Sequence, residues 1–132
     1  MSPVIRVSAG VLVDEEGFAL VVRKQGATVF QQPGGKPEPG EDAVAALVRE
    51  VHEEVGVVLD AADLEPLGTF EAAAANEPGH VVIGDAFRAR IRRADVRLGA
   101  EIEDARWLRE ADVESTPLAN LSRHHLIRFA WA

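Results

Sequence analysis

The chain has 132 residues, of which 47% are hydrophobic and 27% are charged, and it contains no cysteine. This length and composition predict one folded domain, residues 1–132, with a single core. The absence of cysteine excludes disulfides, thiolate metal sites and cysteine nucleophiles. No apolar run reaches the roughly 20 residues that cross a bilayer, and the first residues lack the pattern of a signal peptide. We therefore expect a cytoplasmic protein.

The charge balance is acidic, with 22 Asp and Glu against 14 Lys and Arg and a formal net charge of −8. A field of this sign disfavours general affinity for nucleic-acid backbones and for anionic lipid. We therefore expect neither a membrane nor a long nucleic acid as partner. The same field suits the recruitment of divalent cations, although an acidic surface can also serve solubility alone.

The N-terminal part of the chain predicts a β-hairpin. Residues 4–13 alternate loosely and are rich in β-branched side chains, which is typical of a strand. A turn at 14–17 leads into a second strand at 18–22. A short extended piece at 29–32 follows, and Pro33-Gly34-Gly35 ends it.

The next segment changes to a helical period. Loop residues rich in proline and glycine extend to about residue 41, and a helix is predicted over 42–55. Gly56 stands where helices often stop. Five apolar residues form one stripe along this helix. They are Val44, Leu47, Val48, Val51 and Val55.

The second half predicts further strands and one more helix. Strands are expected at 67–73, 80–91 and 105–108, with a turn at 76–79 between the first two. Thr116-Pro117 resembles an N-cap followed by proline at the first helical position, which predicts a final helix through residue 129. Strands interleaved with two helices indicate the α/β class, with a mixed sheet covered by helices on its faces.

Three glutamates on the first helix are candidate metal ligands. Glu50, Glu53 and Glu54 stand at i, i+3 and i+4, so their carboxylates project from one side. Like charges at this spacing repel, and a hard cation such as Mg²⁺ would reverse the penalty. Arg49 lies four residues before Glu53 and can pair with it. A solvated acidic helix face is the alternative interpretation of this pattern.

The glycines just before this helix strengthen the metal interpretation. Gly34 and Gly35 allow a ligand to approach the backbone closely, or allow unusual backbone angles. A free carbonyl in this segment could supply a metal oxygen, and exposed N–H groups could meet phosphate. A simple turn is the alternative.

Nine residues between Gly35 and Val57 fit one continuous pattern, G-x5-E-x7-R-E-U-x-E-E-x-G-U, where U is apolar. They are Gly35, Glu41, Arg49, Glu50, Val51, Glu53, Glu54, Gly56 and Val57. The pattern resembles the Nudix box with no departure, and the order of strands and helices around it is similar to the rest of a Nudix domain. The resemblance therefore implies a Nudix-type α/β/α sandwich, with a mixed β-sheet between helices, over essentially the whole chain.

The Nudix resemblance implies hydrolysis of a diphosphate linked to another moiety, usually a nucleoside, with Mg²⁺ or Mn²⁺. The metals would bind to the three glutamates Glu50, Glu53 and Glu54, assisted by the carbonyl of Gly34 or Gly35. Metals would neutralise phosphate oxygens and activate water, and a carboxylate would accept its proton.

The resemblance also suggests roles for the residues around the metals. Arg49 would orient Glu53, and Glu41 would steady the loop–helix junction. Glu53 or Glu54 is our first choice for the proton acceptor. Glu101, just before the strand at 105–108, is a candidate auxiliary carboxylate and metal ligand, with an ordinary loop glutamate as the alternative.

The substrate is less well indicated, and a small nucleotide diphosphate derivative is the expected partner. Asn120, after Pro117, lies where Nudix enzymes of the MutT type, which act on oxidised guanine nucleotides, place a base-reading asparagine. Arg23 and Lys24 could meet the outer phosphate, and Phe30 could line a nucleotide pocket. The alternatives are a polar residue in the first turn of a helix for Asn120, plain surface cations for Arg23 and Lys24, and a core aromatic for Phe30.

Other activities remain open at this point. An ADP-ribose or nucleotide-sugar pyrophosphatase and a non-catalytic nucleotide-binding Nudix module are the main alternatives. The chain lacks the tyrosine that dinucleoside polyphosphate hydrolases tend to carry after the box and the proline of ADP-ribose pyrophosphatases. An RNA-processing enzyme would need a basic channel, which the net charge of −8 disfavours. The sequence leaves open whether the chain forms a homodimer.

Overall fold

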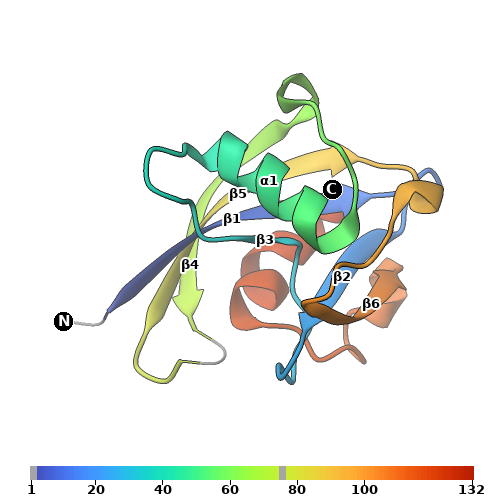
Figure 1. Ribbon diagram of the computed structural model, residues 1–132. Helices are drawn as coiled ribbons and strands as arrows, with labels where there is room; N and C mark the ends of the chain where they lie inside the picture. Colours follow the sequence, from blue (N-terminus) through green and yellow to red (C-terminus); the bar gives the residue numbers. More distant parts are fainter. Residues whose placement is uncertain (1–2, 75–76) are drawn as a thin grey trace.

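One mixed β-sheet runs through the molecule (Figure 1). The computed structural model describes residues 3–74 and 77–132. The strands follow the order β4-β5-β1-β2-β6, and β3 pairs with β1 beside this path. The β1–β5 pair is parallel, and the other pairs are antiparallel. The strands are β1 (Val4–Val13), β2 (Ala19–Lys24), β3 (Gly34–Gly35), β4 (Glu65–Ala73), β5 (Val81–Arg90) and β6 (Ile102–Leu108).

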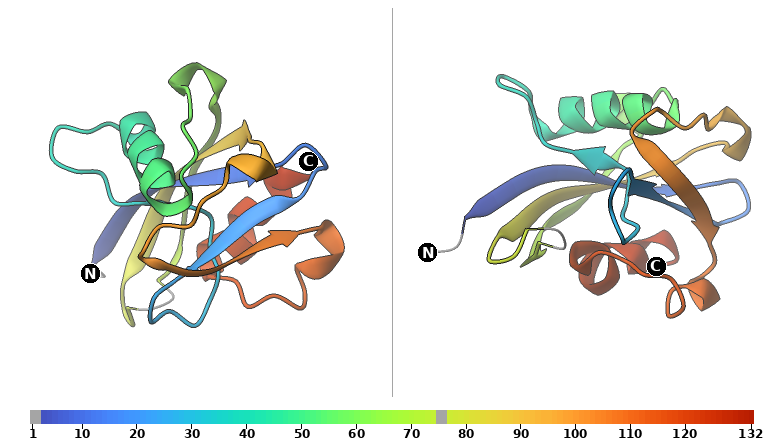
Figure 2. Two further views of the ribbon diagram at one scale, coloured as in Figure 1. Left: turned by 45° about the vertical axis from the view of Figure 1, so that its right-hand side comes forward. Right: turned by 60° about the horizontal axis from the view of Figure 1, so that its bottom comes forward.

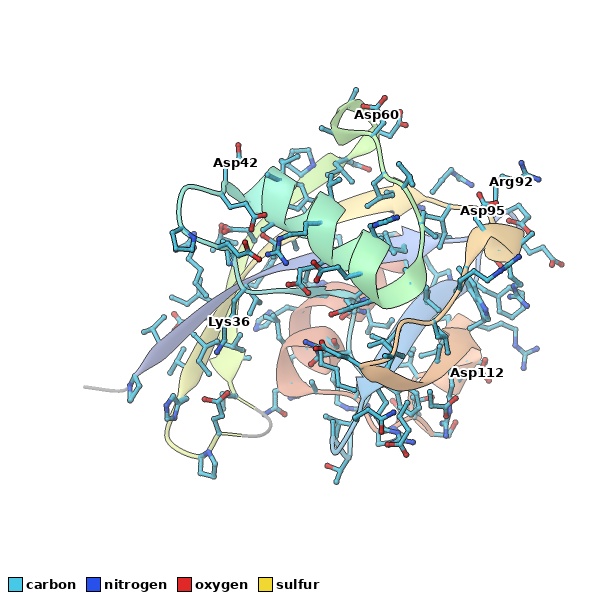
Figure 3. All side chains as sticks on the ribbon, viewed as in Figure 1. Lys36, Asp42, Asp60, Arg92, Asp95 and Asp112 are labelled. Carbon is cyan, nitrogen blue, oxygen red and sulfur yellow. The ribbon has the colours of Figure 1, made fainter. Side chains whose placement is uncertain are left out.

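The long helix α1 (Ala43–Val55) begins and ends at the residues that its sequence signals indicate. The side chain of Asp42, at the start of α1 in Figure 3, accepts a 2.8 Å hydrogen bond from the Ala45 N–H. Gly56 adopts the left-handed conformation, with φ of 73°, and closes the helix. The predicted helix over 42–55 is thereby confirmed.

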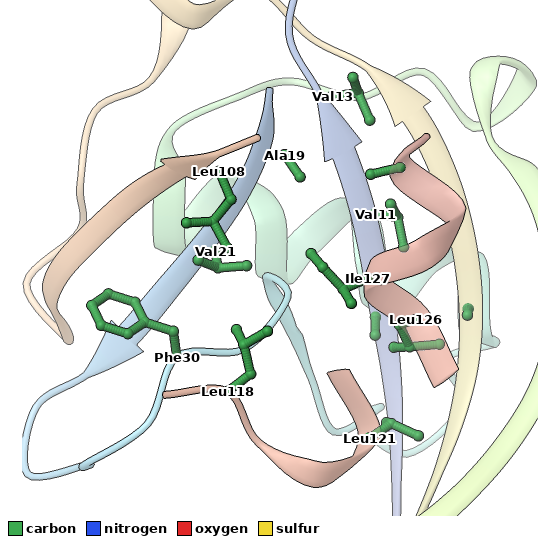
Figure 4. Close-up of a cluster of buried hydrophobic side chains, with 13 residues drawn as sticks. Val11, Val13, Ala19, Val21, Phe30, Leu108, Leu118, Leu121, Leu126 and Ile127 are labelled. Atoms are coloured by element: carbon green, nitrogen blue, oxygen red, sulfur yellow. The ribbon is translucent and has the colours of Figure 1, made fainter. Parts of the chain in front are cut away.

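Helical elements cover both faces of the sheet (Figure 2). On one face, the apolar stripe of α1 packs on the sheet, and Leu47, Val51 and Val55 are completely buried. On the other face, Leu126 and Ile127 of the C-terminal helical segment pack against strand residues and complete a second cluster (Figure 4). The predicted α/β sandwich with a mixed sheet between helices is confirmed.

The final helix differs from the prediction. Thr116-Pro117 does not open it, because the backbone here pairs with the segment before β3: the Phe30 N–H donates to Pro117 O at 2.8 Å and the Ala119 N–H to Phe30 O at 2.9 Å. The helical segment follows this pairing as a π-helical turn, Ser122–Leu126, and a 3-10 turn, Ile127–Ala130.

Short elements complete the fold. Single 3-10 turns occupy Ala61–Asp63, Arg93–Asp95 and Glu110–Asp112. The turn predicted at 76–79 is present at residues 77–79, where Gly79 has φ of 81°, whereas Asn76 lies outside the described residues. Within the described part of the chain, no helix is both long enough and apolar enough to span a bilayer.

Candidate functional site

A cleft of about 490 Å³ opens beside β3. Its walls come from β1, the glycine strand β3, α1, the loop before β6 and the C-terminal helical segment, with further residues from the neighbouring strands. Its lining includes three charged residues, Lys24, Glu50 and Glu101, and the glycine Gly35. Asn120 lines it from the helical segment. The cleft therefore lies between the acidic side of helix α1 and a second, largely uncharged wall.

The two glycines of β3 fit the backbone tightly against its neighbours. Gly34 has φ of 151°, and a side chain there would overlap the carbonyl oxygen of Ser8 on β1. A Cβ on Gly35 would lie 2.6 Å from Cδ of Glu50. Gly34 therefore has to be glycine for β3 to lie this close to β1, and a side chain on Gly35 would displace the carboxylate of Glu50.

Glu54 is the most buried of the three helix glutamates, with 4% of its side chain exposed. The Gly34 N–H donates to its Oε1 at 3.2 Å, and Lys24 Nζ lies 3.5 Å from its Oε2. Burial raises the pKa of Glu54 to about 7, although the ammonium of Lys24 and the Gly34 hydrogen bond partly oppose this effect. The neighbouring carboxyl of Glu50 raises the pKa further.

The other two glutamates have different surroundings. The side chain of Glu50 is 16% exposed and lies beside Gly35, within hydrogen-bonding reach of Glu54. The side chain of Glu53 is 58% exposed. Two of the three predicted carboxylates therefore converge on the glycine strand. Across residues 3–74 and 77–132, no group of three acidic or histidine side chains forms a complete metal cluster.

Arg49 connects the helix to the loop before it. Its Nε and second terminal nitrogen donate to the two carboxylate oxygens of Glu41 at 2.7 and 2.9 Å. Its first terminal nitrogen donates to Glu50 at 2.8 Å and reaches Glu53 only at 3.5 Å. The hydrogen bond from Arg49 lowers the pKa of Glu41 to about 2. Glu41 thus steadies the loop–helix junction as expected, and Arg49 is held mainly by Glu41 and Glu50 rather than by Glu53.

The donor set suits a hard divalent cation. Two carboxylates that lie within reach of each other need either a shared proton or a cation between them. Glu50 and Glu54 have this relationship, next to the backbone of Gly35. All these donors are oxygens, which Mg²⁺ and Mn²⁺ prefer. The residues present therefore fit the predicted metal.

Glu101 reaches the cleft because the loop before β6 is tied to the end of α1. The Arg97 N–H donates to Val55 O and the Gly99 N–H to Glu54 O, both at 2.8 Å. This loop therefore satisfies carbonyls at the helix C-terminus, which would otherwise lack partners. It also delivers Glu101 to the same cleft as Glu50.

The predicted substrate-binding residues divide into two groups. Lys24 and Asn120 line the cleft, and the side-chain amide of Asn120 donates to Ala73 O at 3.1 Å. Lys36, which directly follows β3, lines it as well (Figure 3). The cleft wall thus carries two ammonium groups and one asparagine.

Arg23 and Phe30, the other two residues predicted to bind the substrate, do not line this cleft. Arg23 donates to Ala27 O at 3.2 Å and to Glu103 at 3.3 Å, so its guanidinium serves the neighbouring turn and strand β6. Phe30 is only 2% exposed because it belongs to the core cluster on the face opposite α1. The guanidinium of Arg106 covers its ring, 4.5 Å from the ring centre.

Two cleft residues were not anticipated from the sequence. Gln32 precedes the glycines and Ser122 begins the π-helical turn, and both line the cleft although they are 90 residues apart. The sequence signal for Gln32 is a polar residue at the end of an extended, otherwise buried segment. Ser122 has no comparable signal, because only the fold brings it to Gln32.

Comparison with known proteins assigns the family. The model of the NUDIX domain matches residues 4–129. The chain therefore belongs to the Nudix family. An RNA pyrophosphohydrolase of Legionella pneumophila is 42% identical over 65 residues, which cover 48% of this chain and 36% of the relative. An 8-oxo-dGTP diphosphatase of Haemophilus influenzae is 36% identical over 72 residues, covering 52% of this chain and 53% of the relative. The chain thus matches only about a third to a half of these curated relatives.

Solved structures show the same fold. A MutT protein of Methanosarcina mazei Go1 superposes with a TM-score of 0.78 at 24% identity, covering 97% of this chain and 94% of the other. The NUDIX domain of Shewanella oneidensis NrtR, solved with ADP ribose, gives the same TM-score at 18% identity and covers 98% and 88% of the two chains. At these identities the likeness establishes the architecture alone.

Proposed function

We propose that this chain is a divalent-metal-dependent hydrolase that cleaves a phosphoanhydride bond in a small nucleoside diphosphate derivative, including nucleoside triphosphates and oxidised purine nucleotides. The observation that carries the proposal is the convergence of Glu50 and Glu54 on the Gly35 backbone at one end of a cleft. The family assignment and the pyrophosphohydrolase relatives support the same reaction class.

Different residues of the cleft would bind the metal and the substrate. Glu50 and Glu54 would hold Mg²⁺, with Glu53, Glu101 and the Gly35 carbonyl as further oxygen donors. A bound divalent cation neutralises phosphate oxygens and lowers the pKa of water. Attack of water on phosphorus breaks the phosphoanhydride bond and releases a proton, which Glu53 or Glu54 would accept. Glu53 is the more open of the two to water, with 58% of its side chain exposed.

Two lysines support binding of the phosphates at the β3 end of the cleft. Lys24 and Lys36 are cations on this wall and would meet the outer phosphate oxygens. Asn120 lies on the helical wall and would contact the moiety attached to the diphosphate. We also propose a cytoplasmic location, which rests on the sequence alone.

A hydrolysis screen tests the proposal. The purified chain is incubated with dGTP, 8-oxo-dGTP, ADP-ribose and a short 5′-triphosphorylated RNA, with Mg²⁺ or with EDTA, and phosphate, pyrophosphate and nucleoside monophosphate are quantified. We expect Mg²⁺-dependent cleavage of at least one nucleotide and a loss of about 100-fold or more in Glu53→Gln, in line with the removal of a proton acceptor. Turnover of the RNA alone would redirect the substrate assignment to the RNA pyrophosphohydrolase type. Nucleotide binding without any turnover would favour a non-catalytic module and refute the proposal.

A further inference from the structure

Lys24 reaches the acidic end of the cleft from the sheet. Leu20, Val22 and Lys24 alternate along β2 onto the same face, and the first two belong to the buried cluster that α1 covers. The alternation therefore directs the lysine side chain toward α1, where its Nζ lies 3.5 Å from Oε2 of Glu54. In the part of the chain that the structure describes, no other basic side chain lies within 4 Å of this carboxylate. Lys24 is thus the cation that directly opposes the charge of Glu54.

The two partners of this ion pair differ in their freedom to move. The side chain of Glu54 is only 4% exposed, and the Gly34 N–H donates to its other oxygen at 3.2 Å. The backbone of Lys24 is also fixed, because its carbonyl accepts the Ala27 N–H at 3.0 Å. Its side chain, however, is 39% exposed and lines the cleft on a flexible alkyl stem. If the pair separates, the ammonium of Lys24 is therefore the group that moves.

A divalent cation on Glu54 would compete directly with Lys24. Mg²⁺ binds carboxylate oxygens at about 2 Å, so on Oε2 it would approach the ammonium that lies 3.5 Å from the same oxygen. Like charges at such a separation repel each other, most strongly where water is scarce. The ammonium then needs another anion. The phosphate oxygens of a substrate would provide one within the same cleft.

We propose that Lys24 is an exchangeable cation, which pairs with Glu54 until a divalent metal binds there and then pairs with a phosphate group of the nucleotide. This inference rests on the proposed function for the metal and for the nucleotide. The exchange makes the two ligands bind cooperatively. Metal alone leaves the ammonium of Lys24 facing a like charge, and nucleotide alone draws the ammonium away from the buried carboxylate of Glu54. Binding of both ligands removes both conflicts.

Measurements of Mn²⁺ binding test the exchange without requiring turnover. Electron paramagnetic resonance follows free Mn²⁺ with and without dGMP, which supplies a phosphate but no phosphoanhydride bond to cleave. The complex of Mn²⁺ with dGMP is measured without protein and subtracted. Oxygen-free buffer at pH 8.5 lies above the pKa of Glu54 of about 7, so protons compete little with the metal. We expect dGMP to tighten Mn²⁺ binding to the wild type at least about fivefold, as is typical of coupled sites.

Lys24→Met removes the ammonium and keeps the alkyl stem. Mn²⁺ alone should bind to this variant about fivefold more tightly than to the wild type, because no cation has to leave Glu54. The gain from dGMP should shrink by the same factor. Lys36→Met is the matched control, since Lys36 lines the same cleft but has no atom pair with Glu54 within 4 Å among the described residues. Its affinity for Mn²⁺ alone should stay within about twofold of the wild type.

The conservative variant Lys24→Arg protects the test against a simple folding defect. It keeps the positive charge and should retain the coupling between Mn²⁺ and dGMP. A lysine that only holds Glu54 in place predicts weaker binding of Mn²⁺ alone to Lys24→Met. A cation that never leaves Glu54 predicts tighter Mn²⁺ binding by the same factor with and without dGMP. Either result would overturn the inference, as would the lack of any effect of dGMP on the wild type.

The possible outcomes separate this inference from the proposed function. A coupling that shrinks in Lys24→Met supports the exchange even where the hydrolysis screen finds no turnover. Nucleotide hydrolysis by a wild type whose Mn²⁺ binding weakens in Lys24→Met would overturn the exchange and leave the proposed function standing.

Discussion

Lys24 on β2 places its ammonium nitrogen 3.5 Å from Oε2 of Glu54 on α1, so a cation from the sheet already neutralises part of the acidic end of the cleft. This pair opposes the effect of burial on the pKa of Glu54, which is nevertheless raised to about 7. Replacement of Lys24 by methionine should therefore raise the pKa of Glu54 further in metal-free protein, because the compensating charge is lost.

NMR titration of the glutamate side-chain carboxyl carbons in EDTA measures this shift. Lys36→Met is the matched control, since Lys36 also lines the cleft but makes no ion pair within 4 Å of Glu54 among the described residues. An unchanged or lowered pKa of Glu54 in Lys24→Met would contradict the role assigned to the ammonium.

Glu54 should also make the metal-free protein less stable at neutral and alkaline pH. Its pKa is about 7 in the folded chain against 4.5 for a free glutamate side chain, so the folded state binds the proton more tightly than the unfolded state. The favourable contribution is complete below pH 4.5 and is lost as the pH rises through about 7, a change on the order of 3 kcal/mol. Urea unfolding in EDTA should show Glu54→Gln gaining stability relative to wild type over this range. A constant difference between the two proteins from pH 4.5 to 8 would disagree with the burial of the carboxylate.

The contact between Gly35 and Glu50 predicts that a side chain at residue 35 displaces the glutamate carboxylate. Gly35→Ala would place a Cβ 2.6 Å from Cδ and 2.7 Å from Oε2 of Glu50, so the carboxylate has to move. We expect a loss of about 10–100-fold in metal-dependent activity, as for displacement of other groups that orient metal ligands. Gly40→Ala is the control, because its Cβ meets nothing within 4 Å and only its φ of 82° is strained. Similar activity losses in both variants would point to general loop disruption instead.

Asp14, in the hairpin turn between β1 and β2, predicts that the stability of the protein falls in acidic solution. Burial alone would raise the pKa of Asp14, but hydrogen bonds from the Phe18 N–H, the Arg93 side chain and the Glu16 N–H outweigh it, so the pKa is lowered. The stabilisation is present above the unfolded pKa near 3.8 and is lost as the pH falls through the lower folded value.

Asp14→Asn should therefore be less stable than wild type at pH 7 by about 2 kcal/mol, a typical value for a hydrogen bond to a charged group. The difference should shrink in increasingly acidic buffer, which denaturant unfolding at several pH values measures. A difference that does not depend on pH would show that shape, rather than charge, makes this residue important.

The parts of the fold that local signals determine were predictable from the sequence. Helix α1 has its cap at Asp42, its apolar stripe and its stop at Gly56 within one continuous segment, and the structure has the helix in that place. Thr116-Pro117 carries an equally plausible local signal, but the pairing of Phe30 with Pro117 and Ala119 competes for the same backbone groups and prevails.

Within the site, too, the local contacts were predictable from the sequence and the contacts made by the tertiary fold were not. The convergence of Glu50 and Glu54 on Gly35 follows from helical spacing and the adjacent glycines. The contact of Arg49 with Glu41 rather than Glu53 could not be read from helical spacing, because it depends on the path of the loop. The meeting of Gln32 with Ser122 is likewise a product of the tertiary fold, as the two residues are 90 positions apart.

Binding of Mn²⁺, followed by electron paramagnetic resonance, tests most directly whether Glu50 and Glu54 form a divalent-cation site at the glycine strand. The wild type should bind the ion, and Glu50→Gln and Glu54→Gln should each bind it at least about tenfold more weakly, whereas Glu16→Gln, in the distant hairpin turn, should bind it as the wild type does. Undiminished Mn²⁺ binding in both helix variants, with their fold intact, would contradict the assignment of the site.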